Sequence, residues 1–257
     1  MKNTEKEFQR LLDIMDELRT KCPWDKAQTL ESLRKLTIEE TYELAEAILE
    51  NDLQEIKKEL GDLMLHIVFY SKIGSEKNAF DMGDVLKSIN EKLIYRHPHI
   101  FGDVDVETAR DVERNWEALK LKEEGRNKKV LEGVPCALPA LVKANRIQEK
   151  ASGVGFDWEQ REQVWDKVKE EISELNDEIV KGDTDKMEAE FGDLFFAMVN
   201  AARLYGIDPE AALERTNQKF IKRFNYLESQ TMGKGIDLKK MSLAEMDKIW
   251  DEAKKSE

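Results

Sequence analysis

The stretch EETYELAEAILENDLQEIKKELGDLMLHIV, residues 39–68, has the pattern of two helices joined at Asn51-Asp52. Apolar residues recur every three to four positions on both sides of this break, which is the period of an α-helix. Asn and Asp favour turns because their side chains bond to the nearby backbone. Such a short connection makes the helices run antiparallel and side by side. The stretch therefore predicts an antiparallel helix pair.

The same pattern returns later in the chain, in EEISELNDEIVKGDTDKMEAEFGDLFFAMV, residues 170–199. The two blocks align without a gap, and Gly182-Asp183 takes the place of Asn51-Asp52. Beyond the blocks, the pattern N-x-K-[LF]-x-x-R occurs at residues 90–96 and again at 217–223. Repetition on this scale indicates the duplication of one domain.

These patterns predict an all-α fold: a tandem duplication of a helical-bundle domain with paired antiparallel acidic helices. Runs of Val, Ile and Thr with a period of two residues, which would indicate strands, are missing. We expect an N-terminal domain at residues 1–125 and a C-terminal domain at 126–257, because Gly, Pro and charged residues cluster between the copies. In the first copy, helices are expected at residues 4–20, 30–50, 53–74, 82–95 and 107–123, and a loop at HPHIFGD, residues 97–103.

The composition argues against several classes of function. The 257 residues carry 41 basic and 54 acidic side chains, a formal net charge of −13, which disfavours nonspecific binding to nucleic acid or to an anionic membrane. Two well-separated cysteines, Cys22 and Cys136, make neither a disulfide framework nor a zinc knuckle. There is no apolar signal segment, and no apolar run approaches the roughly 20 residues of a membrane helix. We expect a cytoplasmic protein.

The second helix of the pair places two acids among residues that are apolar on almost every side. Glu59 and Asp62 lie one turn apart on one stripe, and Glu190 and Asp193 repeat them in the second copy. The pattern predicts that this helix is buried all round. Because a carboxylate is almost never buried without a partner, the stripe must face a cation or water.

The first helix of the pair is expected to supply the opposite wall of a cation site. Glu40 and Glu43 are i,i+3 neighbours that can point the same way, and Glu171 and Glu174 repeat them. Antiparallel packing would then gather four carboxylates in each copy, and these repel strongly unless divalent cations lie between them. Oxygen ligands suit Mg²⁺ or Mn²⁺. We expect the core face of this helix to be Ile38, Tyr42, Ala45 and Leu49.

Other interpretations of these acids are weaker. An isolated ExxE motif is usually a solvated surface, but here the same four acids recur at the same spacing in both copies. A di-iron site would need ExxH on two helices, whereas His66 follows Asp62 at a different spacing and aligns with Ala197. His97 and His99, in HPH, are more typical of loop packing than of metal ligation.

The ordered motifs resemble the MazG type of all-α nucleoside triphosphate pyrophosphohydrolases. EExxE followed by ExxD is the signature of that family, and CPWDKAQTLESL, YRHPHIF and LPALVKANRIQEKASGVGFDW are similar to its two-domain form along nearly the whole chain. The resemblance implies hydrolysis of an NTP or dNTP to the monophosphate and pyrophosphate, a role in clearing the nucleotide pool, Mg²⁺ as cofactor and a homodimer. By motif match the Mg²⁺ ligands would be Glu40, Glu43, Glu59 and Asp62 in the first copy and Glu171, Glu174, Glu190 and Asp193 in the second.

The chemistry of this reaction suggests roles for further residues. A metal ion can orient a water and lower its pKa, and an adjacent carboxylate can take the proton, for which Glu39 and Glu170 are candidates. Phosphate charge that the metal does not hold needs Lys or Arg, and a recurring Trp can stack on a base or, equally, pack helices. The recurring candidates for substrate binding are Lys92, Arg96 and Trp116 in the first copy and Lys219, Arg223 and Trp250 in the second.

The two copies differ at one position on the acidic stripe. The second copy has Lys186 where the first has Glu55. A cation helps to hold a triphosphate and an acid hinders it, so we hypothesise that the second copy is the main triphosphate site. The first copy would be weaker or take another phosphate ligand. The alternatives are a metal-binding helical interaction or sensor protein without catalysis, and a two-metal phosphodiester hydrolase, which is disfavoured because the repeat keeps no His.

Overall fold

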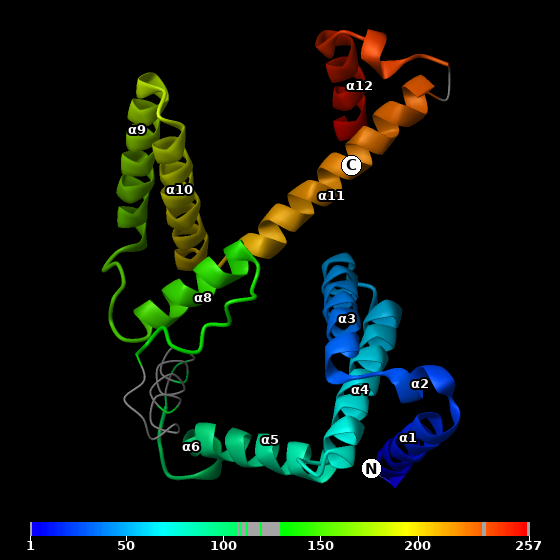
Figure 1. The fold of residues 1–257 in the computed structure, drawn as a ribbon. Coiled ribbons are helices and arrows are strands. Elements are labelled where there is room, and N and C mark those ends of the chain that lie inside the picture. The colour runs from blue at the N-terminus through cyan, green and yellow to red at the C-terminus, as the bar shows by residue number, and fades with distance from the viewer. Residues whose placement is uncertain are drawn as a thin grey trace. The chain divides into compact units, whose positions relative to one another are not determined.

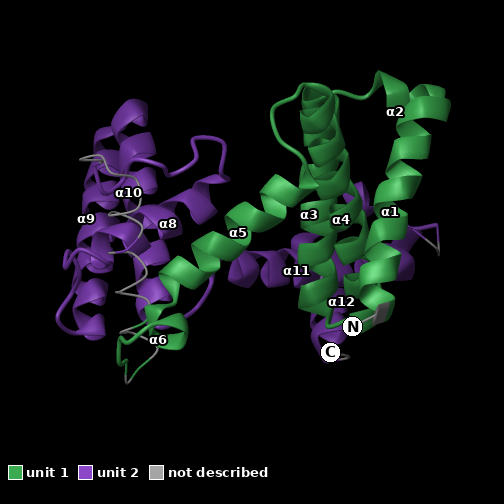
Figure 2. Ribbon diagram, turned by 90° about the horizontal axis from the view of Figure 1, so that it is seen from below, with its two compact units in different colours: residues 1–116 green, residues 117–257 purple. Residues whose placement is uncertain are grey.

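The computed structural model describes residues 2–106, 108, 112, 119, 129–232 and 235–255. Every regular element in this part of the chain is a helix, which confirms the all-α class (Figure 1). The chain divides into two compact units, Met1–Trp116 and Glu117–Glu257, shown in different colours in Figure 2. The domain boundary expected at residue 125 lies outside the described residues and stays a prediction. Most of the helix expected at 107–123, including Trp116, lies outside them too.

The helices of each unit follow one another with short connections. Unit 1 contains α1 (Lys2–Lys21), α2 (Pro23–Ala27), α3 (Leu30–Glu50), α4 (Leu53–Glu76), α5 (Met82–Arg96) and α6 (Pro98–Phe101). Unit 2 contains α8 (Ala140–Ser152), the 3₁₀ turn η1 (Arg161–Gln163), α9 (Val164–Lys181), α10 (Thr184–Leu204), α11 (Pro209–Thr231), the 3₁₀ turn η3 (Leu238–Lys240) and α12 (Leu243–Lys255). None of the described helices has the length and apolarity of a membrane span.

The acidic helix pair forms in both units, as α3 with α4 and as α9 with α10 (Figure 1). The first helix of each pair ends at a residue with a left-handed backbone, Asn51 with φ 57° and Gly182 with φ 74°, which stops the helix. The next residue caps the second helix: a carboxylate oxygen of Asp52 accepts from the backbone N–H of Gln54 at 2.9 Å, and Asp183 caps α10 in the same way. The breaks predicted at these dipeptides are therefore confirmed.

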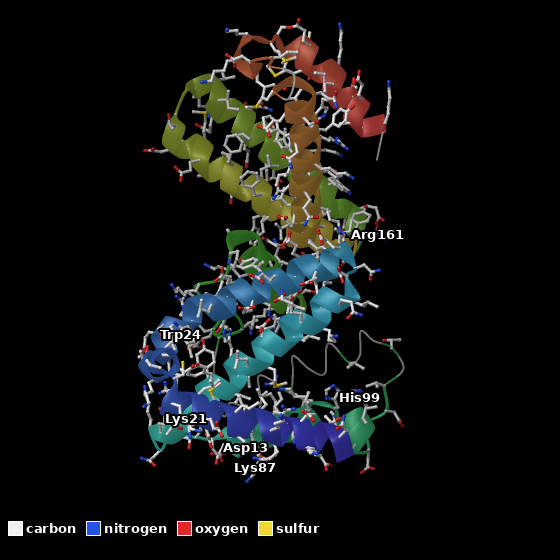
Figure 3. The ribbon with its side chains drawn as sticks, turned by 90° about the vertical axis from the view of Figure 1, so that its right-hand side faces the viewer. Asp13, Lys21, Trp24, Lys87, His99 and Arg161 are labelled. Carbon is white, nitrogen blue, oxygen red and sulfur yellow. The ribbon has the colours of Figure 1, made fainter. Side chains whose placement is uncertain are left out.

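The loop predicted at residues 97–103 is wrong for Pro98–Phe101, which forms α6. Proline is favoured in the first turn of a helix because its φ is already helical and its missing N–H has no helical partner there. His99 lies on this turn (Figure 3), and its ring centroid is 5.6 Å from that of His97. The two histidines thus contact each other at the α5–α6 junction.

The core of unit 1 lies where α1, α3 and α4 meet. Its buried side chains are Met15, Leu33, Val68, Phe69 and Ile73. All of the α4 members follow Asp62, so the apolar core occupies the C-terminal half of α4 and leaves the acids in the other half. The core therefore anchors the helix pair at one end of the acidic stripe.

The prediction that α4 and α10 are buried all round is wrong for the described chain. Leu60, Met64 and Ile67 on α4 are exposed, and so are Phe191 and Phe195 on α10. Most of the face expected to be the core of α3 is exposed as well, with Ile38 43% and Tyr42 54% accessible, whereas Leu49 is partly buried. Within each unit the described helices therefore leave apolar residues uncovered on the outer side of the acidic helix pair.

Arg19 ties three elements of unit 1 together. Its guanidinium donates to both carboxylate oxygens of Glu76, at 3.0 and 2.6 Å, and to the backbone carbonyls of Asp25 and Gln28. The guanidinium also lies over the Phe69 ring, 5.5 Å from its centroid. The Arg19 side chain is 12% exposed, so these contacts are largely shielded from water.

We expect Arg19→Met to lower the free energy of unfolding by about 2 kcal/mol, because it removes the donor of the Gln28 carbonyl and the charge-assisted pair with Glu76. The half-exposed Glu76 keeps the loss from being larger. Urea unfolding of the full chain measures the change. Arg10→Met is the control, since Arg10 lies on the same helix and pairs with Glu7 in solvent. Equal effects of the two substitutions would contradict the role given to Arg19.

Candidate metal centre

The acidic residues lie on the face where the two helices of each pair meet. In α9 that face carries the buried residues Val168, Glu171 and Leu175. The aligned face of α3 carries the partly buried Glu40, at the place of Glu171, and the buried Ala47. Successive positions on this face are three or four residues apart. On α3, Glu40 therefore stands in an otherwise mostly apolar row, whereas on α9 Glu171 shares the row with Glu178, whose side chain is 13% exposed.

Three of the four predicted ligands gather in unit 1. Glu40, Glu43 and Glu59 each offer a carboxylate oxygen, and these oxygens lie within 4.8 Å of one another. We call this set the first cluster. Glu59 comes from α4 and is only 2% exposed, whereas Glu40 and Glu43 come from α3 and face it across the helix pair.

The equivalent three residues gather in unit 2. Oxygens of Glu171, Glu174 and Glu190 lie within 4.8 Å of one another, and we call this set the second cluster. Here the most buried acid is Glu171 on α9, which is 4% exposed. The two clusters are thus built from the same aligned positions. The most buried carboxylate lies on the second helix of the pair in unit 1 and on the first helix of the pair in unit 2.

The fourth predicted ligand of each copy lies outside these groups. Asp62 is partly buried and close enough for its charge to act on Glu40. Asp193, at the aligned position on α10, is exposed. Both follow the clustered glutamate by one helical turn, which places them on the same stripe. Their part in the site stays a prediction.

The clusters also shift the acidity of their members. Desolvation, followed by the negative charge of Asp62 and Glu43, raises the pKa of Glu40 above its usual value. Desolvation and neighbouring acids, first among them Glu171, raise the pKa of Glu174 in the same way. Carboxylates held this close therefore favour a bound proton or another positive charge.

The raised pKa of Glu40 predicts how stability depends on pH. A carboxyl whose pKa is raised on folding stabilises the fold fully below its unfolded value of about 4.5. This contribution is lost as the pH rises through the folded value. In EDTA, the stability of the wild type relative to Glu40→Gln should therefore fall as the pH rises above about 4.5, as urea unfolding can show. Glu46→Gln, at an exposed acid of the same helix, is the control. A difference that grows with pH would contradict the shift.

The residues present fit a hard divalent cation. All donors of the two clusters are carboxylate oxygens, the ligands that Mg²⁺ and Mn²⁺ prefer. In the first cluster, Oε2 of Glu59 is buried and has no hydrogen-bond partner in the described part of the chain. A buried acceptor without a donor is costly unless a cation binds it. The chemistry of the donor set and this unsatisfied oxygen both match a metal site.

Two lysines outside the predicted set of site residues bind these clusters. The Lys58 ammonium lies 2.8 Å from Oε1 of Glu59, and the Lys167 ammonium lies 2.6 Å from Oε1 of Glu171. Lys167 precedes Glu171 by four residues, a spacing that brings helix side chains together and was therefore visible in the sequence. Lys58 directly precedes Glu59, a spacing that gives no such signal.

The candidates for water activation differ between the units. Glu170 accepts from the Lys167 ammonium at 2.8 Å, next to the second cluster. Glu39 is an exposed residue beside Glu40. Lys186, predicted to hold phosphate, pairs with the helix cap Asp183 at 3.4 Å and is 63% exposed.

The remaining substrate-binding candidates lie on other helices. Lys92 and Arg96 are on α5, which follows the C-terminal end of α4, whereas Glu59 lies near its N-terminal end. Lys219 and Arg223 are on α11, which follows α10 in the same way. Figure 1 shows α5 and α11 running away from the helix pairs, so the structure does not bring these cations beside the cluster of their own unit.

Arg223 and Trp250 do meet each other. The Arg223 guanidinium lies 5.8 Å from the centroid of the Trp250 ring. The centroid of the Phe220 ring lies 5.0 Å from that of the Trp250 ring. These contacts join α11 to α12 and hold Trp250 in place. The predicted counterpart Trp116 lies outside the described residues.

Comparison with known proteins supports the sequence-based resemblance. The family model of the MazG nucleotide pyrophosphohydrolase domain matches residues 28–101 and 159–227, which contain one cluster each. Two separate matches confirm the duplication.

Named relatives cover the chain almost completely. The nucleoside triphosphate pyrophosphohydrolase/pyrophosphatase MazG of Thermotoga maritima is 42% identical over 96% of this chain and 95% of its own length. The nucleoside triphosphate pyrophosphohydrolase of Escherichia coli K12 is 40% identical over 98% of both chains. A crystal structure of a MazG-related protein from Thermotoga maritima, 28% identical, covers 44% of this chain and 99% of its own, with a TM-score of 0.40. The chain belongs to the MazG nucleotide pyrophosphohydrolase family and carries its domain twice.

Proposed function

We propose that this protein hydrolyses nucleoside triphosphates, NTP or dNTP, to the monophosphate and pyrophosphate, using Mg²⁺ held by the two carboxylate clusters. The observation that carries the proposal is the grouping of three carboxylates within 4.8 Å in each unit, around an acid that is almost fully buried. The activity named for the relatives supports the reaction. Mn²⁺ is expected to substitute, because it accepts the same oxygen ligands.

In the second copy, different residues would bind the metal ion and accept the proton from water. Glu171, Glu174, Glu190 and Asp193 would hold the ion. Mg²⁺, when bound, supplies a Lewis acid that lowers the pKa of a water and offsets phosphate charge. Glu170, which pairs with Lys167, would take a proton from water beside the cluster. In the first copy Glu40, Glu43, Glu59, Asp62 and Glu39 would act in the same roles.

Cations and aromatic rings would hold the rest of the nucleotide. Lys219 and Arg223 have the charge to bind phosphate oxygens, and Trp250, already in contact with Arg223, offers a ring face to a base. Lys186 can turn from Asp183 to a phosphate at little cost, because an exposed ion pair contributes at most about 1 kcal/mol. The aligned Glu55 would repel a phosphate, so we propose that the second copy is the main triphosphate site.

We propose a homodimer as the working assembly. Each acidic helix pair leaves large apolar residues exposed beside its cluster, among them Tyr42 at 54% and Phe195 at 60%. Exposed apolar patches of this kind mark interaction surfaces. A second copy of the chain would cover them and can bring α5 and α11 to the clusters, which the single chain does not do. A cytoplasmic location and a role in clearing the nucleotide pool are part of the proposal.

A product assay tests the function. Incubation of the protein with a panel of NTPs and dNTPs and Mg²⁺ should yield the monophosphate and pyrophosphate, and EDTA should abolish the reaction. Release of orthophosphate would point to a different hydrolase. Metal binding without any nucleotide cleavage would favour the alternative, a metal-binding helical interaction or sensor protein.

A further inference from the structure

Each carboxylate cluster has a lysine bound to its most buried acid. Lys58 binds Oε1 of Glu59 at 2.8 Å, and Lys167 binds Oε1 of Glu171 at 2.6 Å. The acceptors are shielded from water, with the Glu59 side chain 3% and the Glu171 side chain 5% exposed. An ammonium group facing such a carboxylate forms a strong charge-assisted hydrogen bond.

Each lysine is fixed further by a second acid outside the cluster. Lys58 also binds Glu55 at 3.1 Å, and Lys167 also binds Glu170 at 2.8 Å. Two acceptors restrict where the ammonium can lie.

The two lysines come from opposite helices of the pair. Lys58 is on α4 and aligns with Ala189 in the second copy, whereas Lys167 is on α9 and aligns with Leu36 in the first. Neither lysine is therefore part of the repeated motif. What the two units share is the contact itself, an ammonium group on one oxygen of the buried acid.

In the first cluster, the contact with Lys58 occupies only one of the two carboxylate oxygens of Glu59. One oxygen of Glu59 is held by Lys58, while Oε2 is buried and has no hydrogen-bond partner in the described part of the chain. An oxygen of Glu59 lies within 4.8 Å of oxygens of Glu40 and Glu43. A carboxylate gripped at one oxygen cannot rotate freely, so its other oxygen keeps a fixed direction.

We propose that Lys58 and Lys167 are positioning residues of the metal sites, each holding one oxygen of the buried ligand so that the other is presented to the metal. This inference rests on the proposed metal-dependent function. Hydrogen-bonding partners of metal ligands commonly act in this way, and their loss typically costs about 10- to 100-fold in metal affinity.

A competing role for the lysines predicts the opposite sign. If the ammonium only competes with the metal for the carboxylate, removing it also removes repulsion between two cations. Metal would then bind more tightly to the variants. The sign of the change in affinity therefore distinguishes a positioning residue from a competing counter-ion.

The test is calorimetric titration of Mg²⁺ into the EDTA-treated, dialysed full chain carrying Lys58→Met or Lys167→Met. We expect each substitution to raise the Kd of one set of sites by about 10-fold and leave the other set unchanged. Matched controls are Lys57→Met and Lys169→Met, at neighbouring lysines that bind Gln54 and Asp166 instead of a cluster acid. Both controls should bind Mg²⁺ like the wild type.

Lys58→Gln and Lys167→Gln guard against misfolding, because the amide retains donors for the buried carboxylate while removing the charge. Because a neutral donor holds a carboxylate oxygen more weakly than an ammonium group does, they too should weaken Mg²⁺ binding, but less than Met does. Far-UV circular dichroism verifies their fold. Unchanged or tighter binding in folded Gln or Met variants overturns the positioning role while the metal site stands. A wild type that binds no Mg²⁺ overturns the proposed function and this inference together.

Discussion

Glu171→Gln is expected to lower the rate of pyrophosphate release by at least about 100-fold, because even the partners of metal ligands are worth 10- to 100-fold. Glu171 is the most buried acid of the second cluster; it binds Lys167, and one of its oxygens lies within 4.8 Å of oxygens of the other two acids. Glutamine keeps the size of the side chain but replaces one charged oxygen with an amide group. The loss would therefore come from the removed ligand and not from a cavity.

Glu40→Gln, at the aligned position of the first copy, is expected to cost much less activity, since Glu55 makes that copy the poorer triphosphate site. Glu188→Gln, at an exposed acid of α10, is the control and should leave the rate unchanged. Steady-state release of pyrophosphate from a dNTP measures all three. Equal losses in Glu171→Gln and Glu40→Gln would contradict the asymmetry between the copies.

Phe195→Asp is expected to dissociate the proposed homodimer. Phe195 is 60% exposed, and its ring lies 6.2 Å from that of Phe191 on the same face of α10. A carboxylate at the centre of an apolar interface costs about 3 kcal/mol or more, which corresponds to roughly a 100-fold higher Kd for dimerisation. Light scattering coupled to size exclusion measures the mass.

The control for this experiment is Phe156→Asp. Phe156 is 83% exposed and lies in the connection between α8 and η1, outside the helices α9 and α10 of the acidic pair. The control should keep the mass of the wild type. A wild type that is monomeric at micromolar concentration, or a Phe195→Asp variant that stays dimeric, would contradict the proposal that this face is an interface between copies.

The ends and caps of the acidic helices could be predicted from the sequence, because each depends on a few neighbouring residues. Asn51 and Gly182 can adopt a left-handed backbone, and Asp52 and Asp183 can cap the following helix. Each of these properties depends only on neighbouring residues. The helix pair, its antiparallel course and the aligned position of the clusters were therefore predictable.

The packing of the helices was less predictable, because it depends on distant partners. Periodicity groups residues into faces but does not say which face meets which helix. Ile38 and Tyr42 share one face of α3 and Leu33 and Ala47 another, yet only the second pair is buried in the chain. The first face was wrongly assigned to the core because it is the more continuously apolar one.

The ion pairs of the site were also hard to predict from the sequence. Lys58 and Glu59 are consecutive residues, which point in different directions along a helix, so their ion pair depends on how long side chains bend towards the cluster. The acids themselves were found because a duplication repeats them. Lys58 and Lys167 were missed because neither has a counterpart in the other copy.

Binding of Mn²⁺ to the full chain tests most directly whether the carboxylate clusters are the metal sites of this enzyme. Electron paramagnetic resonance of free Mn²⁺ gives the bound fraction in the wild type and in the double variant Glu40→Gln, Glu171→Gln, with dNTP cleavage followed in the same samples. We predict at least one bound ion per cluster in the wild type, and loss of both binding and cleavage in the double variant. A double variant that binds Mn²⁺ and cleaves dNTP like the wild type would contradict the claim.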